Sequence, residues 1–460
     1  MRIRSKQVMT SFTVLLSALL VLAGCSSGTS SSTGTSTSTG GSGTVSPAAA
    51  SPAPAPATAA PAEKVRLKLM FQKGQGTKDY FGDWMQENIS LFKAKNPNID
   101  FEVIANTCCD NYLTVITTDM AANNLPDIFQ GWTLERMRPF AEAGRLLDLT
   151  SAINENPDWK TNMSPDALKG TTFNGKVYGL PLAQDAEIVY YNKEVFAKNN
   201  LQPPKTYDEL LNIIDVLKKA GITPITMPNK EPWVGTIPYM MLTERIGGLD
   251  TYQATVMDKK GSWKDQPFLD AGQKLQELIK RGAFEENVNS ITTKESEIKL
   301  SEGKAGMYAM GTWSIAPLYG AMKENLGFFN FPDISGGKGS KDHYLILPNS
   351  ALSVSGSSKH PKEALEFMKF VFSQERQLAF AKLGYLTAYN TKVQAGDLSP
   401  FNEQLIKAIN AKTGLMYPWD VPLGVFMGKE LNNTTQSLYT GANPSEAFDK
   451  LQKTAESQKK

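Results

Sequence analysis

Hydrophobic residues near the start of the globular part of the chain recur with the spacing of alternating strands and helices. The apolar run VRLKLMF, from Val65 to Phe71, predicts a strand, and apolar positions in Trp84 to Lys95 recur with the period of a helix. Asn96 and Pro97 end that helix before a second predicted strand, IDFEVIA. A strand, a helix and a strand in this order indicate a parallel crossover unit, so the expected fold class is α/β.

The same alternation continues further along the chain. A helix is predicted over Tyr112 to Asn123, a strand over LPDIFQGW, and a helix over Thr133 to Ala143 that ends at Gly144. Thr206 and Glu209 have the spacing of a capping box in front of another segment of helical period. Open parallel sheets bind ligands at the carboxyl ends of their strands, so the loops that follow these strands are candidate binding positions.

The first 24 residues have the pattern of a secretory signal peptide. Three basic residues precede the apolar run Val14 to Ala23, which is too short to span a bilayer. The sequence Leu22-Ala23-Gly24-Cys25 resembles the bacterial lipobox, whose cysteine is lipidated and becomes the new N-terminus. We therefore expect 1–24 to be removed and Cys25 to carry a lipid, palmitate included, that anchors the protein at the extracytoplasmic face of the cell membrane. The alternative is an ordinary signal peptide that contains a cysteine.

Residues 25–62 have the composition of a linker. They consist of Ser, Thr and Gly and then of Pro and Ala, with no charge before Glu63, so they cannot bury enough apolar area to offset chain entropy. Residues 1–24 hold three of the 48 basic residues and no acidic ones, so their removal changes the net charge from +2 to −1. A near-neutral surface argues against a nucleic-acid partner. Residues 63–460 exceed what a single core usually holds, which predicts two lobes.

Sequence motifs of catalysis are scarce. The chain has two histidines, and it contains neither the H-E-x-x-H nor the G-x-S-x-G pattern, nor a Walker phosphate loop. Adjacent cysteines without a second ligand pair do not make a four-ligand zinc site. We therefore expect a binding protein rather than an enzyme, with no metal and no cofactor. A secreted hydrolase that acts on polysaccharide stays an alternative, because the 46 acidic residues allow many carboxylate pairs in space.

Motifs in a fixed order identify a family resemblance from about Val65 to the C-terminus. These motifs are LPDIF (125–129), VYYNKEVF (189–196), EGKAGM (302–307) with MGTW (310–313), SSKHPKEA (357–364) and LYTGANPSEA (438–447). The series resembles the extracellular carbohydrate-binding proteins of ABC importers, the broad family that includes maltose-binding protein. The resemblance implies a monomer that binds a sugar in a cleft between two lobes and delivers it to a membrane permease. A peptide, a polyamine or a metal chelate as the ligand is the alternative within the binding class.

The resemblance also implies interleaved lobes of a periplasmic-binding-protein-like fold, joined by a hinge. The expected N-terminal lobe comprises 63–182 and 314–372, and the expected C-terminal lobe comprises 183–313 and 373–460. By this pattern the chain crosses between the lobes at Pro181 to Ala183, at Gly311 to Ser314 and near Phe372.

Candidate sugar-binding residues follow from the chemistry of sugars. A sugar has apolar C–H faces and a rim of hydroxyl groups, so its site needs flat aromatic rings and side chains that donate or accept hydrogen bonds. Tryptophans near strand ends, loops and the expected hinge meet the first need, and Gln184 and Asp185 meet the second. The tryptophans are Trp132, Trp233, Trp313 and Trp419. Each of these rings can instead be a lobe core residue, which is the competing interpretation.

Cys108 and Cys109 are adjacent in the segment NTCCDNY. Outside the cytoplasm such a pair most simply forms a disulfide with itself. The bond would be strained, because neighbouring Cα atoms lie about 3.8 Å apart whereas ordinary disulfides prefer roughly 4.4 to 6.8 Å. The segment follows a predicted strand, so we expect the Cys108–Cys109 disulfide to line the sugar site, with Asp110 or Asn111 offering hydrogen bonds. A merely structural or reduced pair is the alternative.

Overall fold

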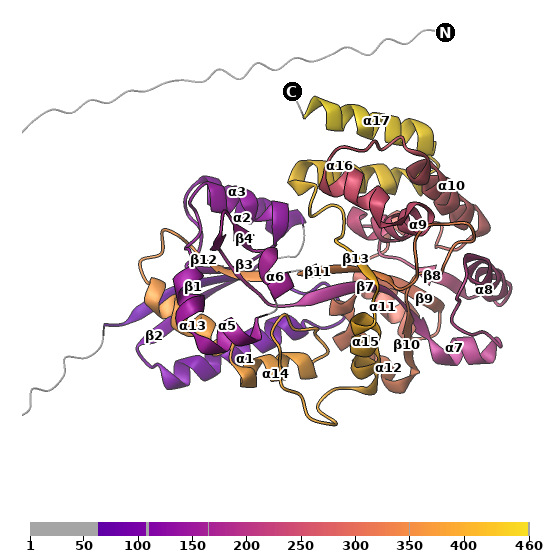
Figure 1. Ribbon diagram of the computed structural model, residues 1–460. Helices are drawn as coiled ribbons and strands as arrows, with labels where there is room; N and C mark the ends of the chain where they lie inside the picture. Colours follow the sequence, from indigo (N-terminus) through magenta and orange to yellow (C-terminus); the bar gives the residue numbers. More distant parts are fainter. Residues whose placement is uncertain (1–62, 107–109, 164, 349, 459–460) are drawn as a thin grey trace, which may run out of the picture. The chain divides into compact units, whose positions relative to one another are not determined.

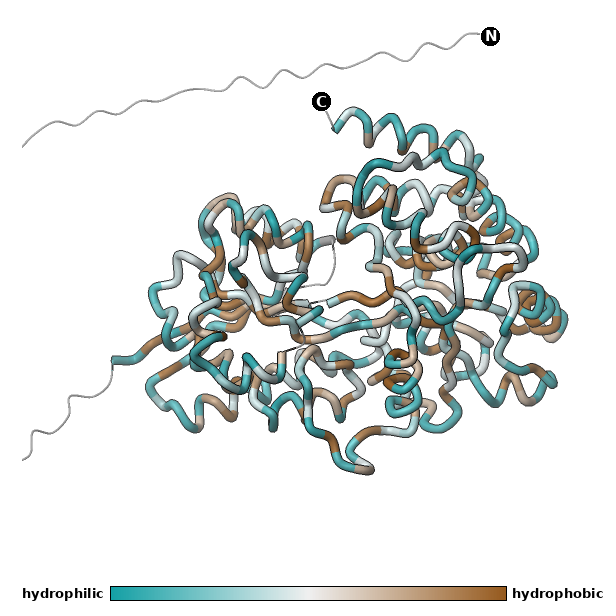
Figure 2. The backbone as a smooth tube through the Cα atoms, viewed as in Figure 1, coloured by the Kyte–Doolittle hydropathy of each residue, from teal (hydrophilic) through white to brown (hydrophobic). Residues whose placement is uncertain are grey.

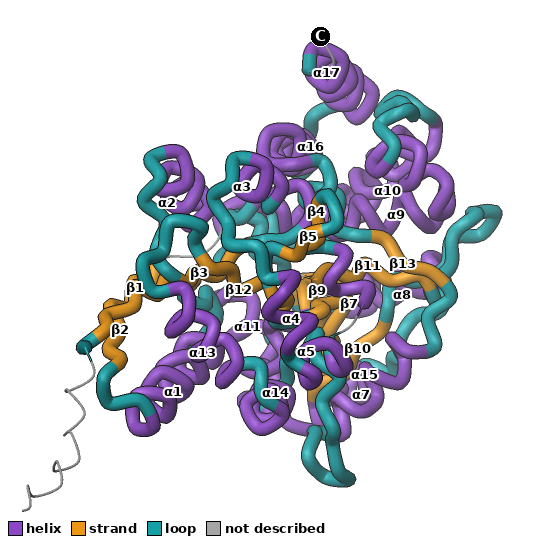
Figure 3. Tube along the Cα trace, turned by 60° about the vertical axis from the view of Figure 1, so that its left-hand side comes forward, coloured by secondary structure: helices purple, strands orange, loops and turns teal. Residues whose placement is uncertain are grey.

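The computed structural model describes residues 63–458, apart from 107–109, 164 and 349, and these residues form two sheets flanked by helices (Figure 1). We call the first sheet with its helices the first lobe, and the second sheet with its helices the second lobe. Helices lie on both sides of the strands (Figure 3). No helix among the described residues is both long and apolar enough to cross a membrane.

The first sheet has the strand order β2-β1-β3-β12-β6. β1 pairs in parallel with β2 and β3, whereas β12 runs antiparallel to both β3 and β6. The parallel pairing of β1 and β2 through an intervening helix confirms the predicted crossover unit. The strands are β1 (Val65–Gln72), β2 (Ile99–Asn106), β3 (Ile128–Gly131), β6 (Leu180–Pro181) and β12 (Ala351–Val354).

The second sheet has the strand order β13-β11-β7-β9-β8, and β10 also pairs with β7. β7 is the central strand, antiparallel to β9, β10 and β11. A separate pair, β4 (Thr172–Phe173) and β5 (Lys176–Val177), lies outside both sheets. The strands of the second sheet are β7 (Gln184–Asn192), β8 (Thr223–Thr226), β9 (Ala305–Gly311), β10 (Leu326–Phe329), β11 (His343–Pro348) and β13 (Gly414–Met416).

Helices cover each sheet. The first lobe has α1 (Tyr80–Lys95), α2 (Asp110–Ala121), η1 (Leu134–Arg136), α3 (Arg138–Glu142), α4 (Thr150–Glu155), α5 (Pro157–Asn162), α6 (Pro165–Lys169), α13 (Pro361–Val371) and α14 (Gln374–Lys382). The second lobe has α7 (Lys193–Lys198), α8 (Tyr207–Lys219), α9 (Pro232–Tyr252), η2 (Gln253–Met257), α10 (Gln266–Arg281), η3 (Val288–Ser290), α11 (Thr293–Ser301), η4 (Thr312–Ser314), α12 (Ile315–Met322), η5 (Lys323–Asn325), α15 (Pro400–Asn410), α16 (Gly424–Leu438) and α17 (Pro444–Ser457).

Local sequence signals set several helix ends. α8 begins with the predicted capping box, in which the Thr206 side chain accepts from the Glu209 N–H and the Glu209 carboxylate accepts from the Thr206 N–H. α10 ends at Gly282, whose φ of 80° suits a residue without a Cβ. The helix predicted over Thr133 to Ala143 is interrupted, because a new helix, α3, begins beside Pro139 after the short turn η1.

Sheet membership corrects part of the predicted lobe boundaries. The sequence predicts that 314–372 lies in the N-terminal lobe, but β10 and β11 pair with β7 in the second sheet. It predicts that 373–460 lies in the C-terminal lobe, but Phe380 of α14 packs on Trp84 of α1, with ring centroids 4.4 Å apart. The chain therefore returns to the first lobe between β11 and β12, not at Gly311 to Ser314, and leaves it after α14, not near Phe372. Long-range pairing decides these crossings, and short motifs do not encode it.

Each lobe has its own apolar core, and apolar residues follow the strands of both sheets (Figure 2). The core of the second lobe includes Trp419, which is 0% exposed. Its ring packs on Tyr239, Tyr252, Trp263 and Phe268, with centroids 5.8 to 6.2 Å apart. This corrects the prediction that Trp419 binds a ligand, because four aromatic side chains enclose the ring and leave no face for a sugar.

We expect Trp419→Ala to lower the free energy of unfolding by about 3–5 kcal/mol, because it leaves a cavity among these rings. Trp419→Phe should cost less, since it keeps most of the packed area. Denaturant unfolding measures both changes. Val393→Ala, at a side chain that is 47% exposed, is the control and should stay within about 0.5 kcal/mol of the wild type. Equal losses for the two tryptophan variants would contradict the packing described here.

Candidate ligand-binding site

A cavity of about 490 Å³ lies between the two lobes, and residues from both lobes line it. The first lobe contributes the loop after β1, the first turn of α1, one face of α2 and the segment after β3. The second lobe contributes the start of β7, the N-termini of α9 and α11, the turn η4 and the start of α16. The aromatic lining residues are Tyr80, Phe81, Trp132, Trp233, Trp313, Phe380 and Tyr385.

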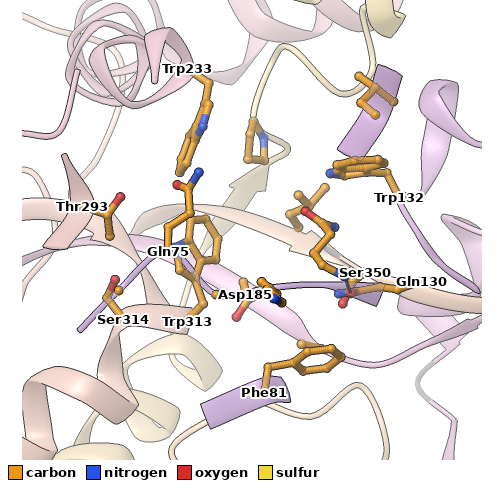
Figure 4. Close-up of a pocket in the computed structure, with 18 of the residues that line it drawn as sticks. Gln75, Phe81, Gln130, Trp132, Asp185, Trp233, Thr293, Trp313, Ser314 and Ser350 are labelled. Atoms are coloured by element: carbon orange, nitrogen blue, oxygen red, sulfur yellow. Dashed lines mark hydrogen bonds between the residues drawn. The ribbon is translucent and has the colours of Figure 1, made fainter. Parts of the chain in front are cut away.

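Three of the four predicted tryptophans line this cavity. Trp233 and Trp313 of the second lobe have ring centroids 5.6 Å apart and an interplanar angle of 58°. Trp132 of the first lobe lies across the cavity from them (Figure 4). Trp132 follows β3, at the predicted strand end, whereas Trp233 lies in the first turn of α9 rather than in a loop. The rings therefore offer flat apolar faces from both sides.

Trp313 folds back over its own strand. Its ring lies against the backbone of Gly311, where a Cβ atom would collide with the indole carbons. The position before the turn η4 therefore has to be a glycine for the ring to lie as it does.

Of the two predicted polar residues on β7, one lines the cavity. Asp185 is buried there, and its Oδ1 atom accepts a hydrogen bond of 2.8 Å from the Thr312 hydroxyl. Gln184 is not among the described residues that line the cavity. Its backbone N–H donates to the Leu386 carbonyl, 2.8 Å away, and its place in the strand is opposite Pro348.

An ion pair across the two lobes involves residues that were not predicted. Arg136 of η1 donates from Nη2 to Oδ2 of Asp420, 2.8 Å away, and both side chains line the cavity. Asn432 of α16 donates to the same oxygen at 3.3 Å. The Arg136 guanidinium also lies 5.6 Å from the centroid of the Trp132 ring, so one cation orients a carboxylate and a ring.

Glu187 carries a buried carboxyl group in the cavity wall. Burial, together with the nearby Asp420 and Asp185 carboxylates, raises the pKa of Glu187 well above its usual value. Its Oε2 atom has no hydrogen-bond partner among the described residues. A buried carboxyl group whose Oε2 atom lacks a partner among the described residues, and whose protonated form is favoured by burial, therefore lies in the cavity wall.

A second contact across the lobes joins Thr77 and Glu297. The backbone N–H of Thr77, in the loop after β1, donates to Oε2 of Glu297 on α11, 2.8 Å away. A Cβ at Gly76 would lie 2.8 Å from both carboxylate oxygens, so glycine permits this close approach. Burial raises the pKa of Glu297 to about 7, although the hydrogen bonds from Thr77 oppose the shift.

Several predicted positions are not tested by the described residues. Cys25, Cys108 and Cys109 lie outside them, so the lipid and the disulfide stay predictions. Asp110 is the first residue of α2. Arg136, Glu187, Glu297 and Asp420 escaped prediction because charged residues are common in the sequence; only the place of Asp420 in the Pro-rich turn YPWDVP was a usable signal.

Comparison with known proteins agrees with this geometry, because residues 76–378 match the family of bacterial extracellular solute-binding proteins. The chain belongs to this family. The predicted resemblance to solute-binding proteins is thus confirmed, and the two sequence relatives named below are described as binding proteins.

Individual proteins of known sequence or structure are similar to this chain over most of its length. An uncharacterized ABC transporter extracellular-binding protein of Pyrococcus horikoshii, PH1039, is 27% identical and covers 64% of this chain and 67% of its own. The diacetylchitobiose-binding protein DasA of Streptomyces coelicolor is 26% identical and covers 65% and 68%. A solved structure from work on xylan utilization by Caldanaerobius polysaccharolyticus has 30% identity and a TM-score of 0.79, and it covers 85% of this chain and 100% of that one. Its two-lobed fold is the fold described above.

The Glu297 carboxyl group should make stability depend on pH. Its pKa is about 7 in the folded protein and near 4.5 in the unfolded chain, so the folded protein holds an extra proton between these values. The free energy of unfolding should therefore fall as pH rises from about 4.5 to about 7, by about 3 kcal/mol from this group, and level off above. Glu297→Gln should remove that part of the slope in denaturant unfolding measured across this range.

Glu302→Gln is the matched control, since the side chain of Glu302 is 51% exposed and pairs with Lys304 away from the cavity. It should keep the wild-type slope. If Glu297→Gln also keeps it, Glu297 ionises as an ordinary glutamate does.

Proposed function

We propose that this solute-binding protein binds an oligosaccharide between its lobes, outside the membrane, and delivers it to the permease of an ABC importer. The observation that carries the proposal is the set of three tryptophan rings, contributed by both lobes, around a cavity that also holds buried carboxyl groups and a guanidinium. Rings stack on the C–H faces of sugars, and ionised side chains form strong hydrogen bonds with hydroxyl groups. The relatives named for diacetylchitobiose and for ABC transport support the same ligand class and partner.

The mechanism is closure of the lobes on the ligand. A sugar between Trp132 and the Trp233–Trp313 pair touches both lobes at once, so it stabilises the closed arrangement over an open one. Three passages of the chain between the two sheets would form the hinge: β6 to β7, β11 to β12, and α14 to α15. The permease then recognises the closed monomer.

We propose further that the protein is held at the cell membrane by its N-terminus. The lipobox-like sequence that ends at Cys25 supports a lipid anchor, and the Ser-, Gly-, Pro- and Ala-rich residues that follow support a tether of the binding lobes.

Sugar binding can be tested by thermal unfolding with mono- and oligosaccharides. A ligand that binds only the folded protein raises the melting temperature by mass action. We expect an oligosaccharide to do so, and Trp313→Ala to weaken its affinity by about 10-fold or more because a stacking face is lost. Trp159→Phe, in the core of the first lobe, is the control and should lower stability without changing affinity. The absence of a shift with every carbohydrate would overturn the proposal.

The anchor can be tested in cells by fractionation. Cys25→Ser removes the thiol that would receive the lipid, so the protein should leave the membrane fraction. A matched replacement in the tether, Ser26→Ala, should keep the protein in that fraction. Membrane retention of the Cys25→Ser protein would contradict the lipid anchor.

A further inference from the structure

Buried charge in the cavity wall is strongly one-sided. Four carboxyl groups line it while almost inaccessible: Asp185 is 4% exposed, Glu187 4%, Glu297 2% and Asp420 8%. Among the described lining residues Arg136 is the sole cation with a largely buried side chain, since the lysines of the lining are exposed at the rim. These lysines are Lys73, Lys78 and Lys429.

Three of the four carboxyl groups have protein partners. Asp420 accepts from Arg136 and Asn432, Asp185 accepts from Thr312, and Glu297 accepts from the Thr77 N–H. Glu187 differs, because its Oε2 atom is buried and has no partner among the described residues. A buried polar atom left unpaired in the protein costs free energy that a bound ligand can recover.

The position of Glu187 lets it act together with its neighbours. Glu187 and Asp185 are two residues apart on β7, so both side chains project from the same face of the strand. The Asp420 carboxylate is near enough to oppose ionisation of Glu187. Arg136, which pairs with Asp420, is the one arginine among the described residues that line the cavity.

We propose that the oligosaccharide recognised here carries a protonated amine, as an amino sugar does, and that this ammonium group binds at Glu187 between Asp185 and Asp420. The inference rests on the proposed sugar-binding function and narrows its ligand class. An ammonium group has three donors and no acceptor, which suits a site made of carboxyl oxygens. A neutral hydroxyl group can fill the space, but it brings no positive charge to these buried carboxyl groups.

Binding of the ammonium group should also release a proton from Glu187. Without ligand, burial and the nearby Asp420 and Asp185 carboxylates raise the pKa of Glu187 and so favour its protonated form. An ammonium group at this position favours the carboxylate, so the ligand displaces the proton. Calorimetry at about pH 6 in two buffers with different ionisation enthalpies should therefore detect proton release with an amino sugar, and none with its neutral counterpart.

The decisive experiment is calorimetric titration of the purified protein with three matched β-1,4-linked series. These are oligosaccharides of glucosamine, of N-acetylglucosamine and of glucose, which differ only at one substituent. We expect the glucosamine series to bind about 10-fold or more tightly than either neutral series. Glu187→Gln should reduce this ratio at least about five-fold, because it keeps the shape of the side chain and removes its charge.

Controls separate the site from general charge effects. Glu302→Gln removes one negative charge at an exposed position and should keep the wild-type ratio. Asp185→Asn removes charge beside Glu187 and provides the test should Glu187→Gln fail to fold, which thermal unfolding reports.

Each outcome decides the question. If neutral sugars bind and glucosamine oligosaccharides bind no more tightly, the amine inference is wrong and the sugar function stands. A preference for the amine that neither variant reduces would refute the assignment to Glu187. If no carbohydrate binds, both proposals fail. Both also fail if the protein binds the polyamine spermidine but none of the carbohydrates.

Discussion

The central place of β7 in the second sheet is the constraint on which the rest of the structure depends. The strand follows directly from β6 of the first sheet, and it pairs with β9 on one side and with β10 and β11 on the other. Successive side chains of β7 point to opposite faces of the sheet, one toward the core and one toward the cavity. Tyr190 points into the core, where its hydroxyl donates to the Gly311 carbonyl at 2.9 Å, while Asp185 and Glu187 reach the cavity. The strand by which the chain enters the second lobe thus also supplies polar side chains to the cavity.

Carboxylates of the second lobe take part in two contacts between the lobes. Arg136 pairs with Asp420, and the Thr77 N–H donates to Glu297, so in both contacts the first lobe presents the donor and the second lobe the carboxylate. Such contacts gain strength from burial and lose it when water enters, whereas an apolar seam of the same area would hold the lobes closed without a ligand. Contacts of this kind therefore suit the proposed closure of the lobes on a ligand.

Much of the fold could be predicted from the sequence because its signals are local. Apolar periodicity predicted β1, α1 and β2, and the capping box predicted the start of α8. The lobe boundaries were harder, because β10 and β11 join the second sheet through pairing with a strand more than a hundred residues earlier. Local patterns carry no information about such partners.

In the site, too, some features could be predicted from local sequence and others could not. Rings at strand ends and beside turns were recognisable, and Trp132, Trp233 and Trp313 line the cavity. Trp419 and Asp420 are neighbours in one Pro-rich turn, yet the ring fills the core and the carboxylate faces Arg136. Nothing in the sequence tells which of two adjacent side chains turns inward. Arg136 is 284 residues away from Asp420 along the chain, so only the folded chain unites them.

The glycine under the Trp313 ring has an evolutionary consequence. Since the ring occupies the space that a Cβ at Gly311 would need, replacement by alanine forces the indole to a new position without replacing any of the described residues that line the cavity. A single base change in a glycine codon gives alanine. A duplicated gene could thus acquire a differently shaped site in one step, through a backbone position that no survey of ligand contacts would include.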